Sequence, residues 1–385
     1  MLRTMQVAFL GVLSFTAVAV ELPDKAVLKA ESAANQQWMR QHYLQLLRSA
    51  PPTARASVLT SSVLFEEGVL LPEPEANFLA LLKTEGLNST ALWNLAYVCR
   101  RPVYRESCAD ERVRERLIAS DPDNAAVHLL PHFTNPQNAD EKPKLSRQDV
   151  LNAAQAKRYD TYFARAAYQV FELALPAVES KPRPRSISVP DIEEPISWQA
   201  ASIAMGAMYA LPGFGNFFDI CAHARRQDEL ELLAACEGLA ALLKDHSRSL
   251  IAHNLGTALE RQLVMQADPE SEQALEMYRR QRLETRVLVC LSNWVWPSSI
   301  ERVLAIDIGS MLKELGELGE FAFTERWADK NSTEHPDWAD RTPDECRALR
   351  DLEGEAMIAE LGDEDPYRLW LEEGDKIRSA VTAGN

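Results

Sequence analysis

The C-terminal third of the chain concentrates aromatic and acidic side chains of the kinds that bind and cleave polysaccharides. It holds five of the eight tryptophans: Trp294, Trp296, Trp327, Trp338 and Trp370. Carboxylates surround them: Asp329, Asp337, Asp340, Asp344, Glu345, Asp363, Glu364 and Asp365. Glycosidases combine aromatic walls with two facing carboxylates, so an all-helical (α/α) carbohydrate-active enzyme is one hypothesis. Because the chain is poor in glycine and tyrosine, structural tryptophans beside solvated acidic turns are the favoured interpretation.

The histidines do not form a recognisable metal site. His128 and His132 are four residues apart, a spacing that can place two ligands on one helical face, but Pro131 lies between them. No glutamate occupies the position that zinc proteases require. His246 and His253 are expected to share a helical face, without further ligands nearby. Since the sequence also lacks a nucleophile elbow, a Walker loop and a calcium loop, we predict no catalytic residue, no cofactor and no metal.

The six cysteines are expected to form disulfides. Six cysteines allow fifteen connectivities. Proximity favours Cys99–Cys108 and Cys221–Cys236, each closing a helical hairpin, and leaves Cys290 and Cys346 for a longer link. Free buried cysteines are the alternative, while metal binding is disfavoured because no Cys-x-x-Cys spacing occurs.

The first residues have the pattern of a cleaved export signal. Arg3 precedes an apolar run over 7–20, and 17–19 supply the small-x-small pattern that a signal peptidase recognises. The run is too short to span a membrane. We therefore predict cleavage near Ala19 and folding in the periplasm or outside the cell, where cysteines pair.

Composition restricts the class of partner. The formal net charge is −16, and removal of Arg3 with the signal makes it −17. Such a chain repels nucleic acid and anionic lipid, so we predict neither as a partner. We expect the partner to be another protein, and the acidity would suit a basic one. No second apolar run of spanning length follows, which argues against a stable membrane anchor. Oligomeric state is left open.

Apolar residues recur at helical spacing through almost the whole chain. Glycine is scarce, at 15 of 385 residues, and no stretch of strict apolar/polar alternation supports a strand. Pro176 is expected to end the helix before it. We therefore predict an all-α fold, with helices over 24–49, 53–67, 75–85, 89–99, 108–120, 123–130, 160–175, 198–211, 217–226, 228–244, 247–266, 269–290, 298–318 and 342–361.

Two proline-rich stretches interrupt the helices, and the second marks a candidate domain boundary. Residues 181–197 contain four prolines and change from basic to acidic. Such stretches resist helix formation. The expected organisation is an N-terminal helical domain over 20–180, a linker or long loop over 181–197, and a C-terminal helical domain over 198–385.

Two segments of the chain resemble each other. Residues 108–129 and 236–255 each run from a cysteine through an amphipathic helix and a polar turn into a second helix. The turn at 121–126 (Asp-Pro-Asp-Asn-Ala-Ala) resembles the one that opens tetratricopeptide-type helix pairs. The cysteine-bearing pairs over 90–130 and 215–260 resemble disulfide-stapled relatives of that repeat in exported bacterial proteins. The resemblance implies a TPR-like solenoid of stacked helix pairs and a binding scaffold.

Three functional hypotheses follow. The first is an exported, non-enzymatic helical-repeat scaffold that binds another protein on a concave face. The second is a periplasmic immunity or inhibitor protein, whose acidity would help it dock on a basic toxin or hydrolase. The third is the carbohydrate-active enzyme, with carboxylates from the C-terminal third.

Overall fold

The computed structural model describes residues 25–132, 138, 140, 144–183, 194–206, 215–267, 271–296 and 300–361. Helices account for about three quarters of these residues, which confirms the predicted all-α class. The predicted signal segment, 1–19, lies outside the described residues.

The N-terminal half begins with a long helix and continues with shorter ones. Local sequence signals start several of them: Asn88 accepts a hydrogen bond from Ala91 N, and Ser146 and Asp149 form a capping box. The elements are α2 (Lys25–Ser49), α3 (Pro52–Val58), η2 (Ser62–Leu64), α4 (Pro72–Leu82), α5 (Ser89–Val98), η3 (Pro102–Tyr104), α6 (Arg105–Asp110), α7 (Val113–Ser120), α8 (Ala125–His128), α9 (Arg147–Ala154) and α10 (Phe163–Ser180).

The C-terminal half contains the longer helix pairs. Ser271 caps one of them by accepting a hydrogen bond from Ala274 N. The elements are α11 (Ile196–Gly206), α12 (Gly215–Arg226), α13 (Leu230–Asp245), α14 (Leu250–Ala267), α15 (Glu272–Val295), α16 (Ile300–Ala305), α17 (Ile308–Leu318), α18 (Glu320–Glu334), α19 (Pro343–Ala348), η4 (Leu349–Asp351) and α20 (Gly354–Leu361).

The helix expected over 53–67 is wrong in its second half. After α3 the chain forms a short antiparallel hairpin of β1 (Phe65–Glu66) and β2 (Val69–Leu70), so the described residues do include strands. Glu67 and Gly68 have φ angles of 49° and 87°. Two successive positive φ angles make the tight turn that suits the twist of a hairpin.

Other helices also differ from expectation: those expected over 298–318 and 342–361 are each interrupted, and α9 was not expected. Arg112, with φ 51°, splits the helix expected over 108–120 into α6 and α7. Pro176 does not end α10, because Ala177 and Val178 beyond it are buried and their packing stabilises the last turn against one lost hydrogen bond. Helix α18 was not expected.

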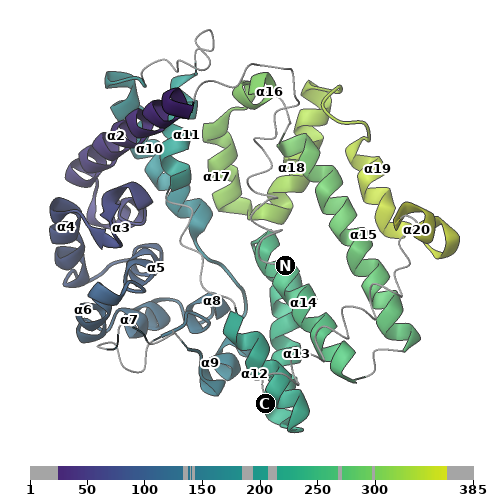
Figure 1. Cartoon of the computed structure of the whole chain (residues 1–385). Coiled ribbons are helices and arrows are strands. Elements are labelled where there is room, and N and C mark those ends of the chain that lie inside the picture. The colour runs from purple at the N-terminus through teal and green to yellow at the C-terminus, as the bar shows by residue number, and fades with distance from the viewer. Residues whose placement is uncertain are drawn as a thin grey trace.

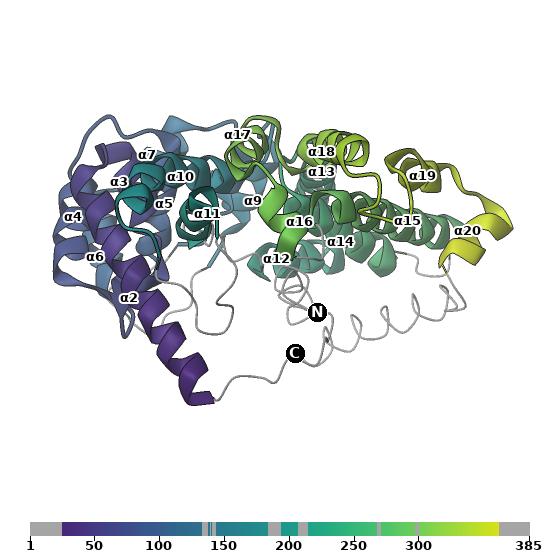
Figure 2. The same ribbon diagram turned by 90° about the horizontal axis from the view of Figure 1, so that it is seen from above.

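The two halves share one hydrophobic core. Helix α10 packs against α11 and α17, and α13 packs against α9 and α14, so segments far apart in sequence lie side by side (Figure 1). A single cluster of buried apolar residues extends from Trp38 to Leu349 and crosses the boundary proposed at 181–197. Residues 184–193 of that boundary lie outside the described part. Seen from above, the helices spread along one long axis, from α4 and α6 to α19 and α20 (Figure 2).

The two segments that match in sequence occupy equivalent positions around a short linking segment, residues 157–159. In the first, α7 and α8 are joined by a turn whose Asp123 carbonyl accepts a hydrogen bond from Arg158 N at 3.2 Å. In the second, α13 and α14 are joined by a turn whose His246 carbonyl accepts one from Tyr159 N at 3.3 Å. The linking segment is therefore held on both edges by the matching turns.

Candidate functional site

The described tryptophans of the C-terminal third belong to the core or pack against it. Trp294 and Trp327 are each 1% exposed and Trp338 is 9% exposed, while Trp296 is half-buried. Trp370 lies outside the described residues. Side chains at these depths cannot form the aromatic walls of a sugar-binding cleft, so the structural interpretation describes them better.

The carboxylates near these tryptophans are engaged by arginines. Asp329 and Asp344 pair with Arg347 at 2.7 and 2.9 Å, and Asp337 pairs with Arg302 at 3.3 Å. Residues 363–365 lie outside the described part. None of the described carboxylates in this group lines either of two surface hollows of the structure. These described carboxylates therefore do not supply the facing pair that a glycosidase needs in its cleft.

The six cysteines form three disulfides. The pairs are Cys99–Cys108 and Cys221–Cys236, which sequence proximity favours, and Cys290–Cys346, the pair that remained for a longer link. Three disulfides indicate an oxidising compartment, periplasmic or extracellular. Among the described helices, none combines the length and the apolar character needed to cross a membrane.

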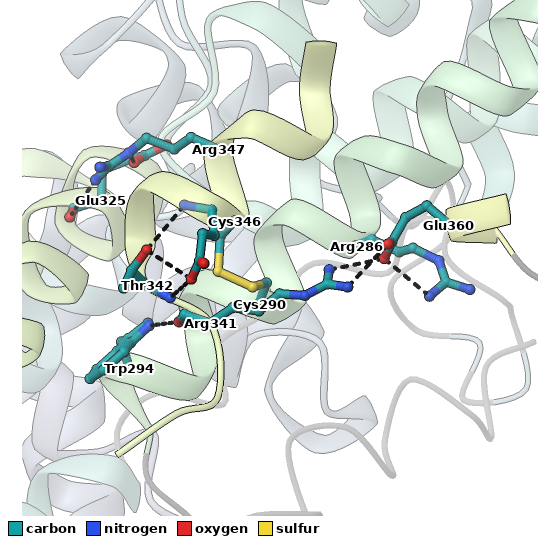
Figure 3. The surroundings of a disulfide bond; sticks show 10 residues. Arg286, Cys290, Trp294, Glu325, Arg341, Thr342, Cys346, Arg347 and Glu360 are labelled. Carbon is teal, nitrogen blue, oxygen red and sulfur yellow. Dashed lines mark hydrogen bonds and ion pairs between the residues drawn. A yellow bond between two sulfur atoms is a disulfide. The ribbon is translucent and has the colours of Figure 1, made fainter. Parts of the chain in front are cut away.

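The longest-range disulfide joins α15 to α19 in a region held by further polar contacts (Figure 3). Trp294 Nε1 donates to the carbonyl of Arg341 at 2.8 Å. The Arg341 side chain pairs with Glu360 at 3.0 Å, and Arg286 of α15 lies 3.8 Å from the same carboxylate. The C-terminal helices are therefore fixed to α15 by ion pairs and hydrogen bonds as well as by sulfur.

His128 and His132 do not converge on a common point. His128 Nε2 lies 2.9 Å from the carbonyl of Pro122, whereas His132 Nε2 lies 3.2 Å from Asp149 Oδ2. No group of three potential metal ligands occurs in the described part of the chain.

Asp149 instead forms a structural ion pair. Arg114 Nη2 lies 2.6 Å from Asp149 Oδ1, and Ser146 donates to Oδ2 from both its main-chain N–H and its hydroxyl. Burial alone would raise the pKa of Asp149. The hydrogen bonds from His132 and Ser146, together with the charge of Arg114, outweigh burial and hold that pKa below its usual range.

The larger of the two hollows is an open groove of about 340 Å³ between α14 and α15, with contributions from α13 and η4. Helices α14 and α15 lie next to each other in the C-terminal half (Figure 1). We call it the α14–α15 groove. Ten of its twelve lining residues have polar or charged side chains, and the full set is Lys244, His253, Asn254, Thr257, Glu260, Met277, Arg280, Gln281, Leu283, Glu284, Thr285 and Arg350.

Close packing on one side and a bridge on the other define the position of α14. A Cβ atom at Gly256 would lie 2.6 Å from Ala240 O and from Lys244 N. Only glycine therefore allows α14 to approach α13 so closely. Toward α15, Gln281 Nε2 donates to Thr257 O at 3.4 Å and to Glu260 Oε2 at 3.1 Å. The groove opens beside this bridge.

The charged side chains of the groove neutralise one another. Lys244 Nζ lies 2.9 Å from Glu260 Oε1. Arg350 makes a two-point contact with Glu284, with Nε–Oε2 and Nη2–Oε1 distances of 2.9 and 3.0 Å. Arg280 pairs with Glu276 at 2.8 Å. The groove thus presents fixed ion pairs rather than isolated charges.

Several polar side chains in the groove retain hydrogen-bonding capacity, among them His253, Asn254 and Gln281, whose Oε1 is buried without a hydrogen-bond partner among the described residues. His253 Nδ1 lies 2.8 Å from Lys244 O, and because a carbonyl only accepts, Nδ1 carries the proton and Nε2 of the neutral ring is an acceptor. Among the described residues, neither this Nε2 nor the Asn254 amide has a hydrogen-bond partner. His246 follows the end of α13, so His246 and His253 do not share a helical face as expected.

A second, smaller hollow lies where α14 begins. It has a volume of about 20 Å³, the scale of a single water molecule, and Asp160, Arg248 and Glu320 are among its lining residues. The Glu320 carboxylate accepts a hydrogen bond from Leu250 N and so caps α14 from another helix. Burial raises the pKa of Glu320 to about 7, although hydrogen bonds from Leu250 and Ser249 oppose that rise.

Sequence reasoning did not locate the groove. It singled out His253 only for its spacing to His246, and Asn254, Gln281 and Glu284 belong to no motif. The one available signal was Gly256 within a helical pattern, since an isolated glycine there often marks close packing. Comparisons with protein-family models, curated proteins and solved structures found no match.

Proposed function

We propose that this chain is an exported, non-enzymatic helical-repeat scaffold that binds another protein in the periplasm or outside the cell, after cleavage near Ala19. The observation that carries the proposal is the α14–α15 groove, an open hollow of about 340 Å³. Its charged groups are held in ion pairs, an arrangement that suits recognition of a partner better than proton transfer.

Charge and cross-linking support the same proposal. The chain carries a net charge of −16, which would attract a basic partner and accelerate encounter. Three disulfides hold the helices in place, so a partner would meet a preorganised surface and pay less ordering entropy. Helices that pack in succession, as α9, α13, α14 and α15 do, are what an array of helix pairs requires.

Affinity capture tests the proposal. The mature, oxidised protein is the bait, incubated with the host's extracytoplasmic fraction, and bound proteins are identified by mass spectrometry. Asn254→Trp would fill the groove, and Gln36→Trp places the same bulk on an exposed position of α2 as the matched control. We expect one dominant protein that wild type and Gln36→Trp retain and Asn254→Trp loses.

The outcome also separates the alternatives. If the captured protein is a toxin or hydrolase whose activity falls on binding, the inhibitor hypothesis replaces the general scaffold. If a folded bait captures nothing, the scaffold proposal is contradicted. A panel of polysaccharide substrates then tests the enzyme hypothesis.

A further inference from the structure

We infer that the α14–α15 groove holds an extended, uncharged segment of the partner polypeptide and recognises its main chain. The inference rests on the proposed function, because it names the part of a protein partner that the groove would take. Three features of the groove lead to it: its paired charges, the unengaged polar groups of His253 and Asn254, and its length.

The paired charges select against a charged occupant. Glu260 is engaged by Lys244 and Gln281, and Glu284 is engaged by Nε and Nη2 of Arg350. A charged side chain entering the groove would have to compete with these contacts, and it would gain little after losing its own hydration. A neutral segment avoids that cost.

The unengaged groups match a peptide main chain. His253 Nε2 can accept a hydrogen bond from a main-chain N–H, and the Asn254 amide can both donate and accept. An α-helix satisfies its own N–H and C=O groups, and helix-in-groove binding relies on an apolar stripe. Met277 and Leu283 are the apolar side chains in the lining, too few for such a stripe. An extended segment leaves its main-chain groups free for the contacts that the groove offers.

The length of the groove sets the size of the segment. On α14 the lining runs from His253 to Glu260. At 1.5 Å rise per residue this is about 10 Å, the length of roughly three extended residues. The groove therefore reads a short element within a longer partner chain.

The test uses a phage-displayed library of random short peptides, panned on the immobilised, oxidised full-length protein. Enriched peptides are synthesised with a fluorescent label, and their Kd values are measured by anisotropy on wild type and two groove variants. Asn254→Ala removes the free amide. His253→Asn removes the Nε2 acceptor while its own amide can still donate to Lys244 O. Gln36→Ala on α2 is the control, and thermal unfolding checks that all variants are folded.

We expect the enriched peptides to share an uncharged stretch, to bind each groove variant about five-fold more weakly, and to bind the control as they bind wild type. The inference is overturned if no peptide is enriched, if a charged residue is shared by the enriched set, if both groove variants bind unchanged, or if neutral oligosaccharides displace the peptides. If Asn254→Trp loses the captured partner while Asn254→Ala and His253→Asn leave peptide binding unchanged, the proposed function stands and only the recognition of an uncharged main chain fails.

Discussion

Removing the Cys290–Cys346 disulfide should destabilise the protein more than removing either of the others. Its cysteines are 56 residues apart, against 15 for Cys221–Cys236 and 9 for Cys99–Cys108. A cross-link restricts the unfolded chain more when it closes a longer loop. On the chain-entropy account, replacing both cysteines by alanine lowers the free energy of unfolding by about 4 kcal/mol for the long loop and about 3 kcal/mol for each short one.

The folded structure should persist without the Cys290–Cys346 disulfide. The loss of stability should therefore come mainly from the greater entropy of the unfolded chain. Arg350 still binds Glu284 of α15, and Glu360 still binds Arg286 and Arg341. Because these contacts hold the C-terminal helices on α15, the change acts mainly on the unfolded chain.

Urea unfolding followed by far-ultraviolet circular dichroism measures the effect on the three double Cys→Ala variants side by side. The regions that the three disulfides link share one core, so each variant should unfold in a single transition. A smaller loss for Cys290→Ala/Cys346→Ala than for the short-loop variants would refute the reasoning. So would a separate early transition, which would mean that the C-terminal helices detach by themselves.

Three further changes test local features. Asp149→Asn should destabilise the protein at neutral pH. The folded pKa of Asp149 lies below that of the unfolded chain, so the stabilising contribution of the carboxylate fades as the pH falls below about 4. Urea midpoints of the variant, measured at several pH values, should therefore approach those of wild type as the pH falls below that value. Glu320→Gln should have the opposite dependence. The folded pKa of about 7 exceeds the ordinary value of 4.5, so wild type loses stability as pH rises through that interval, by up to about 3 kcal/mol, and the variant does not; a constant difference at all pH values would contradict this. Gly256→Ala should lower Tm, because the clash with Ala240, costing about 1–3 kcal/mol, exceeds the gain of about 1 kcal/mol in helix propensity; a raised Tm would show that α14 shifts freely.

The features that could be predicted from sequence follow local rules. Asn88 precedes an apolar helical stripe and caps α5, as its position indicates. Cys99–Cys108 and Cys221–Cys236 follow proximity, because two helices joined by a short connection bring nearby cysteines within reach. The burial of Trp294 and Trp327 also agrees with the favoured interpretation of that region.

The features that could not be predicted depend on contacts between distant residues or on unusual backbone angles. Arg112 adopts a positive φ that its residue type does not signal. Pro176 stays within α10 because packing against distant helices stabilises the turn that contains it. The groove combines side chains from α13, α14, α15 and η4, and no local pattern relates Lys244 to Arg350.

The linking segment also constrains the order in which the chain can fold during synthesis. When Arg158 is synthesised, its hydrogen-bond acceptor, the Asp123 carbonyl, is already present. The acceptor of Tyr159 N, the His246 carbonyl, is synthesised much later. Similarly, α10 lacks one packing surface until α17 has been made. The N-terminal half therefore completes its long-range contacts late, and loop-closure entropy disfavours earlier formation. Such a delay would suit the export that we propose, because the long-range contacts form only after most of the polypeptide has been made.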